Sequence, residues 1–138
     1  MEHSLVIKQD DIHRLLEHAE SQIPLESVAL LFGVVNGSQV KVSTLELVEN
    51  TAKSKTAFMV DPVRQYHLLI ASEERDEELV CVFHSHPAPP VPSSTDVRNM
   101  KLNPVVWLIA SKITGEWEYR AFLLNQKKVP EEIEITSL

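Results

Sequence analysis

Cysteine is almost absent from this sequence, and the single residue, Cys81, limits the chemistry available to the chain. One cysteine cannot form an intramolecular disulfide, and it excludes the zinc motifs that need two cysteines. Cys81 lies in the apolar run from Leu79 to Phe83. A cysteine in such a run is expected to be a small buried hydrophobic residue rather than a nucleophile.

An excess of positive charge and long hydrophobic runs are also lacking. Thirteen basic residues stand against 20 acidic ones, which gives a net charge of −7. This balance argues against a broad basic surface that would bind nucleic acid or an anionic membrane. No apolar run approaches membrane-spanning length, and the start of the sequence does not resemble a signal peptide. We therefore expect a soluble, cytoplasmic protein with a single domain over residues 1–138.

The hydrophobic periodicity predicts an α/β or α+β protein in which helices flank a mixed β-sheet. A short apolar segment at residues 5–7 comes first, with no element assigned to it. Helices are predicted at residues 10–23, 62–75 and 93–102. Strands are predicted at residues 27–35, 40–47, 79–83, 104–110 and 116–124, with a short last strand around Ile133 and Ile135.

The first two strands are expected to form a hairpin. Asn36-Gly37 lies between them, and this dipeptide is a strong signal for a tight turn. The first strand is almost wholly apolar, which indicates a strand covered on both faces, whereas the second alternates and should have one wet face.

Two histidines at the end of an apolar strand form the first part of a candidate metal site. His84 and His86 are two residues apart, so both side chains leave the same face of a strand. Two neutral imidazoles on one face can bind a common metal ion. A hydrogen bond within the core, the usual role of a single buried histidine, explains such a pair less well.

Asp96 is the candidate for the third ligand. The proline-rich segment 87–92 cannot be helical throughout, and Ser93 then opens a helix with Asp96 in its first turn. The alternative for these two residues is a purely structural capping box. Two histidines and one aspartate leave a fourth tetrahedral position for water, as a catalytic zinc site requires.

A hydrolytic metal site also needs a general base, and Glu26 is the best candidate. It lies at the entrance of the apolar strand that follows Pro24. A carboxylate beside such a strand can serve as a base. The alternative is a solvent-exposed glutamate at a strand edge, and spacing alone does not decide between the two.

The arrangement of these residues resembles a known family. His-Ser-His-Pro at 84–87, followed after a short run by Ser-x-x-Asp at 93–96, resembles the signature of the JAMM metalloproteases, the catalytically competent branch of the MPN family. Residues 24–33 are similar to the upstream segment that carries that family's catalytic glutamate. Residues 58–62 resemble its lead into the second helix.

The resemblance implies a role for each candidate residue. His84, His86 and Asp96 would bind one zinc ion per chain, Glu26 would be the general acid/base, and Ser93 would hold the oxyanion. The run before Ser93 is one residue shorter than is usual in the family, so Ser94 remains an alternative to Ser93.

The resemblance also implies a curved, cytidine-deaminase-like core and a zinc-dependent isopeptidase or peptidase. Such an enzyme hydrolyses the bond after the C-terminal Gly-Gly of a ubiquitin-like small modifier by glutamate-assisted attack of a zinc-bound water. Two alternatives stay open: a peptidase that processes sulfur-carrier proteins, and a non-catalytic MPN-type scaffold. The oligomeric state stays open as well.

Overall fold

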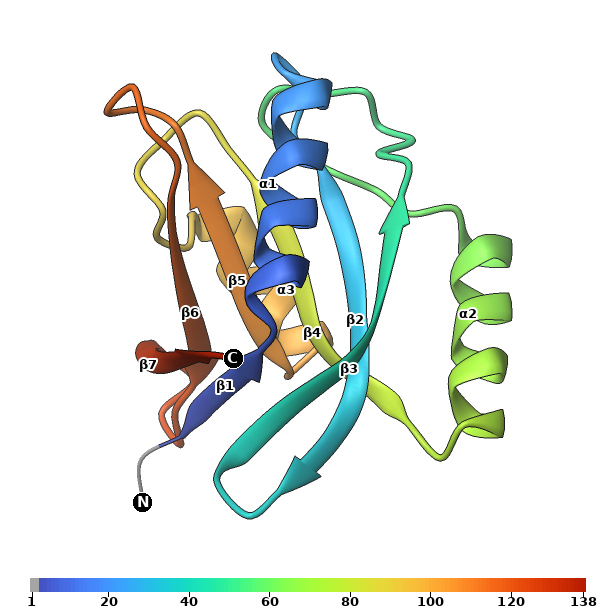
Figure 1. Ribbon diagram of the computed structural model, residues 1–138. Coiled ribbons are helices and arrows are strands. Elements are labelled where there is room, and N and C mark those ends of the chain that lie inside the picture. Colours follow the sequence, from blue (N-terminus) through green and yellow to red (C-terminus); the bar gives the residue numbers. More distant parts are fainter. Residues whose placement is uncertain (1–2) are drawn as a thin grey trace.

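The computed structural model describes residues 3–138, which form three helices and seven strands (Figure 1). The helices are α1 (Gln9–Gln22), α2 (Pro62–Glu74) and α3 (Ser94–Leu102). The strands are β1 (Ser4–Ile7), β2 (Val28–Asn36), β3 (Gln39–Val48), β4 (Glu78–Ser85), β5 (Val106–Ser111), β6 (Glu118–Leu124) and β7 (Pro130–Ser137). None of the helices in this part of the chain is long and apolar enough to cross a membrane.

The strands form one mixed sheet that closes into a barrel in the order β1-β3-β2-β4-β5-β6-β7. β1 runs parallel to both β3 and β7, and β4 runs parallel to β5, whereas the remaining pairs are antiparallel. The predicted α+β class and mixed sheet are confirmed. The apolar segment at residues 5–7, to which the sequence assigns no element, belongs to the strand that closes the barrel.

The helices agree with the predicted ranges because their starts are encoded locally. Asp61 caps α2 by accepting a hydrogen bond from the backbone N–H of Val63, and Pro62 follows it as the first helical residue. Asp10 and Asp11 lie in the first turn of α1, where the helix dipole favours negative charge.

The predicted hairpin joins β2 to β3, but its turn comes one residue later than Asn36-Gly37 suggests. Asn36 still pairs with Gln39, so Gly37 and Ser38 form the turn. Gly37 has a φ of 62°, a conformation that glycine adopts without a steric penalty. The glycine, rather than the asparagine, therefore decides where the chain reverses.

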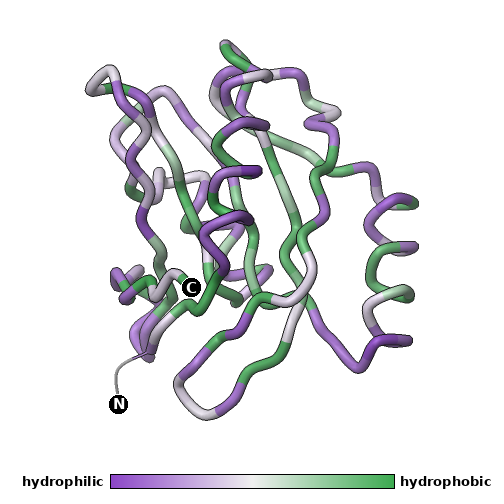
Figure 2. The backbone as a smooth tube through the Cα atoms, viewed as in Figure 1, coloured by the Kyte–Doolittle hydropathy of each residue, from purple (hydrophilic) through white to green (hydrophobic). Residues whose placement is uncertain are grey.

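Alternation along the central strands sorts their side chains onto two faces of the sheet. On one face, side chains of β2, β4 and β5 pack with α1, as Leu31, Phe83 and Leu108 do with Leu15. On the other face, α2 and α3 cover the sheet, as Leu68 and Met100 pack with Leu30, Val82 and Ile109. Figure 2 shows hydrophobic residues along these central strands. β2 is therefore covered on both faces, as predicted, although only over Val28–Gly33.

At Gly33 the backbones of β2 and β3 approach each other closely. A Cβ atom at this position would lie 1.8 Å from the carbonyl oxygen of Lys41 and 2.9 Å from its carbonyl carbon. The register between the two strands also shifts here, since Phe32 faces Thr44 while Gly33 faces Val42. Because backbone atoms would have to move, this position requires glycine.

Gly33→Ala should lower the free energy of unfolding by about 2 kcal/mol or more, because the added methyl group overlaps backbone rather than a flexible side chain. Unfolding in urea measures this change. Val34→Ala, at the next position, where 42% of the residue is exposed, is the control and should cost less than about 1 kcal/mol. Equal stability of the Gly33→Ala variant and the parent would contradict this close approach.

Candidate metal centre

Strand alternation places His84 on the face of the sheet that α2 and α3 cover. His84 is in β4, two residues after Val82, which packs on that face. His86 follows one residue beyond the end of β4. His84 is fully buried and His86 is 8% exposed. The two imidazole rings meet edge to face, with centroids 5.2 Å apart, as their spacing in the sequence predicts.

The start of α3 brings Asp96 to the same point. The Ser93 hydroxyl accepts a hydrogen bond from the Asp96 N–H, and Asp96 Oδ2 accepts one from the Ser93 N–H. This capping box holds Asp96 Oδ1 3.2 Å from His84 Nε2 and Oδ2 3.6 Å from His86 Nε2. The sequence leaves a capping box and a metal ligand as alternatives for Asp96. The structure contains the capping box and also places the carboxylate beside both histidines, so the two roles are compatible.

Glu26 reaches the site through the pairing of β2 with β4. Val28 lies opposite His84 in the register of these strands, and Glu26 is two residues before Val28 on the same face. Glu26 is only 4% exposed, and its Oε1 atom lies 3.2 Å from His84 Nδ1. The exposed alternative for Glu26 is therefore wrong, whereas its role as a base stays a prediction.

Asn50 supports Glu26, a role that its position in the sequence does not indicate. Its side-chain N–H groups donate to the carbonyl oxygens of Glu26, at 2.8 Å, and Ala57, at 3.0 Å. Its side-chain oxygen accepts from the N–H groups of Ala52 and Met59. Asn50 is 4% exposed, although the sequence suggests the first residue of a polar loop. An asparagine after a strand looks like a turn residue, so nothing local indicates this role.

Aromatic side chains enclose His84. The ring centroid of Phe58 lies 5.0 Å from that of His84, and the centroid of Trp107 lies 5.7 Å away. The resemblance in the sequence picks out Phe58 only as part of the lead into a helix. In the structure its ring packs beside the imidazole of His84 and restricts its orientation.

The proline-rich turn orients His86. Its Nδ1 atom lies 3.2 Å from the carbonyl oxygen of Ala88, and Nε2 lies 3.1 Å from that of Val91. A protonated ring therefore donates to two carbonyl groups of the turn. Segment 87–92 thus positions one histidine as well as the start of α3.

The two carboxylates favour positive charge at this point. Burial disfavours the protonated His84 ring, but Asp96 and Glu26 outweigh this effect and raise the pKa of His84 to about 9. Burial also opposes protonation of His86, and Asp96 again raises its pKa. Burial favours the neutral form of Asp96, yet contact with the two histidines holds the pKa of its carboxyl far below the usual range.

A divalent metal ion fits these donors. The ligand atoms of His84, His86 and Asp96 all lie within 4.8 Å of one another. Within residues 3–138, neither buried nitrogen of His84 has a hydrogen-bond partner, despite the nearby carboxylates. Buried polar atoms normally have partners. A metal ion would give one of these nitrogens a partner and would supply the positive charge that the carboxylates favour.

Comparison with known proteins agrees with the site. Residues 8–124 match the family described as prokaryotic homologs of the JAB domain. The chain is 33% identical to a desampylase of Pyrococcus furiosus over 96% of this chain and 89% of that protein. It is also 33% identical to a CysO-cysteine peptidase of Mycobacterium tuberculosis, over 68% of this chain and 64% of that protein.

A solved structure shares the fold. The solution structure of a Desulfitobacterium hafniense protein aligns with a TM-score of 0.83 and 26% identity, covering 97% of this chain and 92% of that one. The family match and the relatives confirm the resemblance to the JAMM metalloproteases. The chain belongs to the family of prokaryotic JAB-domain homologues and is a hydrolase of the JAMM type.

Proposed function

We propose that this protein is a zinc-dependent isopeptidase or peptidase that hydrolyses the bond after the C-terminal Gly-Gly of a ubiquitin-like small modifier. The observation that carries the proposal is the contact of Glu26 with a buried group of two histidines and one aspartate. Its relatives support the substrate class, since they include desampylases and a probable TtuB-protein conjugate cleaving protease of Thermus thermophilus.

His84, His86 and Asp96 would hold one zinc ion. When bound, zinc supplies a Lewis acid that polarises the scissile carbonyl and lowers the pKa of water toward neutrality. All three side chains are buried, so little of their surface is open to bulk water. Three protein ligands that include a carboxylate suit a catalytic ion better than a structural one.

Glu26 would move the proton. Its carboxylate is buried next to His84, and its main chain is held on both sides: its N–H donates to the Ser54 carbonyl and its own carbonyl accepts from Asn50. During hydrolysis the water oxygen bonds to the carbonyl carbon and the C–N bond breaks. Glu26 takes a proton from the water and returns it to the leaving nitrogen.

Ser93 would donate to the oxyanion. Its Oγ atom accepts a hydrogen bond from Asp96, so its own O–H remains free to donate to the carbonyl oxygen of a substrate. Removing one such donor typically costs about 3–4 kcal/mol of transition-state stabilisation. Ser94, the first residue of α3, remains the alternative.

The proposal also covers the type of core, the number of domains and the cellular location. The curved, cytidine-deaminase-like core is supported by a mixed sheet with helices on both faces. A single domain is supported by the one closed sheet, and a cytoplasmic location by the absence of a second cysteine.

Processing of a sulfur-carrier protein is the second candidate function. The similarity to a CysO-cysteine peptidase favours it, and the same side chains would perform the hydrolysis. A non-catalytic scaffold is less favoured, because such a scaffold has no need for a buried Glu26 beside three potential metal ligands.

Purified protein should contain about one zinc ion per chain, and His84→Ala and Asp96→Asn should each reduce this content strongly. Asparagine keeps an oxygen that can accept from the Ser93 N–H, so the loss would reflect the missing charge and not the cap. Elemental analysis measures the zinc, with His67→Ala, an exposed position on α2, as the control. Full zinc retention in both ligand variants would refute the assignment.

Glu26→Gln should retain zinc but lower kcat about 100-fold or more, because glutamine cannot accept the water proton. Single-turnover hydrolysis and elemental analysis on the same sample separate the two effects. Glu17→Gln, which removes an exposed carboxylate from α1, should leave kcat unchanged. An active Glu26→Gln enzyme would require a different base.

Conjugates of Gly-Gly-terminated small modifiers should be cleaved directly after the second glycine, and a chelator should abolish the cleavage. Mass spectrometry of the products locates the cut, and restoring zinc after chelation is the control. Cleavage at other peptide bonds would discard the modifier as substrate while leaving the hydrolytic site intact.

A further inference from the structure

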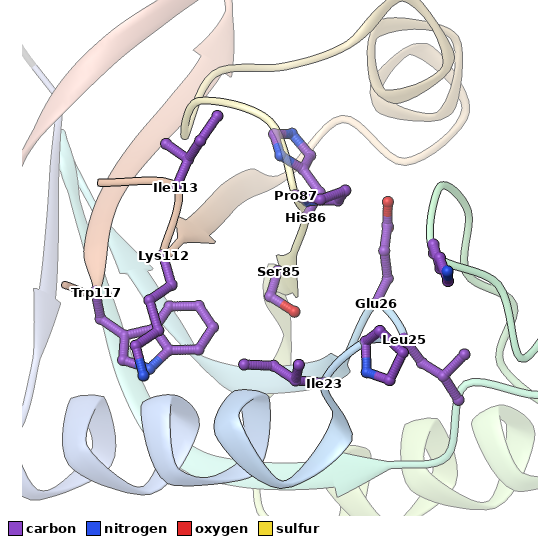
Figure 3. A pocket seen from close by; sticks show the side chains of 11 residues that line it. Ile23, Leu25, Glu26, Ser85, His86, Pro87, Lys112, Ile113 and Trp117 are labelled. Carbon is purple, nitrogen blue, oxygen red and sulfur yellow. The ribbon is translucent and has the colours of Figure 1, made fainter. Parts of the chain in front are cut away.

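A pocket with a volume of about 300 Å³ opens beside the metal ligands, and Figure 3 shows the side chains that line it. Glu26 and His86 form the wall next to the site. The opposite walls are apolar and include Ile23, Ile113 and Trp117. Ile23 is 51% exposed and Ile113 is 56% exposed, so both offer apolar surface that a ligand could cover.

The position of Glu26 decides which part of a substrate enters this pocket. In the proposed function, Glu26 returns a proton to the leaving nitrogen, so the leaving group must lie on its side of the scissile bond. Ser93 would hold the carbonyl oxygen, yet among the described residues neither Ser93 nor any residue of α3 lines the pocket. The pocket is therefore on the leaving-group side.

Two lysines line the same pocket, although the chain as a whole carries a net charge of −7. Lys55 comes from the loop before α2 and makes no ion pair with the described residues. Lys112 follows β5 and pairs with Glu20 of α1. The side chains of this pair are 37% and 49% exposed, so a second carboxylate could reach Lys112.

From these features, and on the basis of the proposed function, we infer that the pocket selects a short leaving group with an apolar side chain and a free carboxylate. The apolar walls would cover the side chain, and Lys112 and Lys55 would attract the carboxylate. The volume is at the lower end of pockets that hold small molecules. An amino acid or peptide end attached through its α-amine fits this description better than a folded protein attached through a lysine side chain.

Binding of the leaving group can be followed without activity. The chain has two tryptophans, of which Trp117 lines the pocket and Trp107 is buried in the core. In an NMR titration of the zinc-loaded protein, leucine should shift the indole N–H signal of Trp117 more than leucinamide does, while Trp107 should not respond. Equal shifts with both compounds, or equal responses of both tryptophans, would overturn the inference.

Kinetics test the role of the lysines. The substrate is a small archaeal modifier whose terminal Gly-Gly is extended by one leucine, as the free acid or the carboxamide. The kcat/KM for the acid should be about fivefold higher than that for the carboxamide, which is the gain expected from one partly exposed ion pair. A modifier joined through an isopeptide bond to the side chain of a lysine amide should be cleaved less efficiently than the acid. Equal efficiency would contradict the preference for a leaving group attached through its α-amine.

Two variants separate carboxylate binding from a structural role of the Lys112–Glu20 pair. Both Lys112→Met and Glu20→Gln break the pair. Lys112→Met should remove most of the preference for the acid, whereas Glu20→Gln should increase it by freeing the lysine. Lys101→Met, on α3, is the control and should leave the ratio unchanged.

The outcomes distinguish the inference from the proposed function. If Lys112→Met and Glu20→Gln change the acid-to-amide ratio in the same direction, the pair is structural and the inference is wrong. If the zinc-loaded protein cleaves none of the modifiers, the proposed function fails and the leaving-group assignment fails with it, even where leucine shifts the Trp117 signal.

Discussion

Ser27, just before β2, faces Ser85, the last residue of β4, with hydroxyl oxygens 2.8 Å apart, and this contact joins residues 58 positions apart in the chain. The Ser27 N–H also donates to the Ser85 hydroxyl. Because alternate side chains leave opposite faces of a strand, pairing the serines on one face brings Glu26 and His84 together on the other. A slip of one residue would send these side chains to the wrong face, so the site depends on this register.

The site also depends on charge compensation inside the protein. Removing a carboxylate from water costs several kcal/mol unless a partner of opposite charge is close. Glu26 and Asp96 approach opposite nitrogens of the His84 ring, so that a protonated ring lies between two negative charges. A metal ion would take over part of that compensation. The Asn50 side chain donates to the Glu26 carbonyl oxygen, and its other three hydrogen bonds tie the loop at residues 52–59 to the same point.

Much of the fold, and the grouping of His84, His86 and Asp96, could be predicted because the signals are local. Helix caps at Asp61 and Ser93, and the two-residue spacing of His84 and His86, act within a few positions of the chain. The burial of Glu26 and Asn50 could not be predicted, because it arises from strand pairing and from a loop that folds back over the strand end. The parallel partners of β1 are equally invisible to local patterns.

The closure of the barrel has a consequence for the order in which the protein is made. β1 is synthesised before every residue of the proposed metal centre, yet it pairs with β7, which is synthesised after all of them. The family match, over residues 8–124, contains neither strand. During translation, β2, β4 and α3 can therefore associate while β1 still has an open edge. Only when Pro130–Ser137 has left the ribosome can β7 cover that edge, so the nascent chain can bring its proposed metal ligands together before its sheet is protected from other chains.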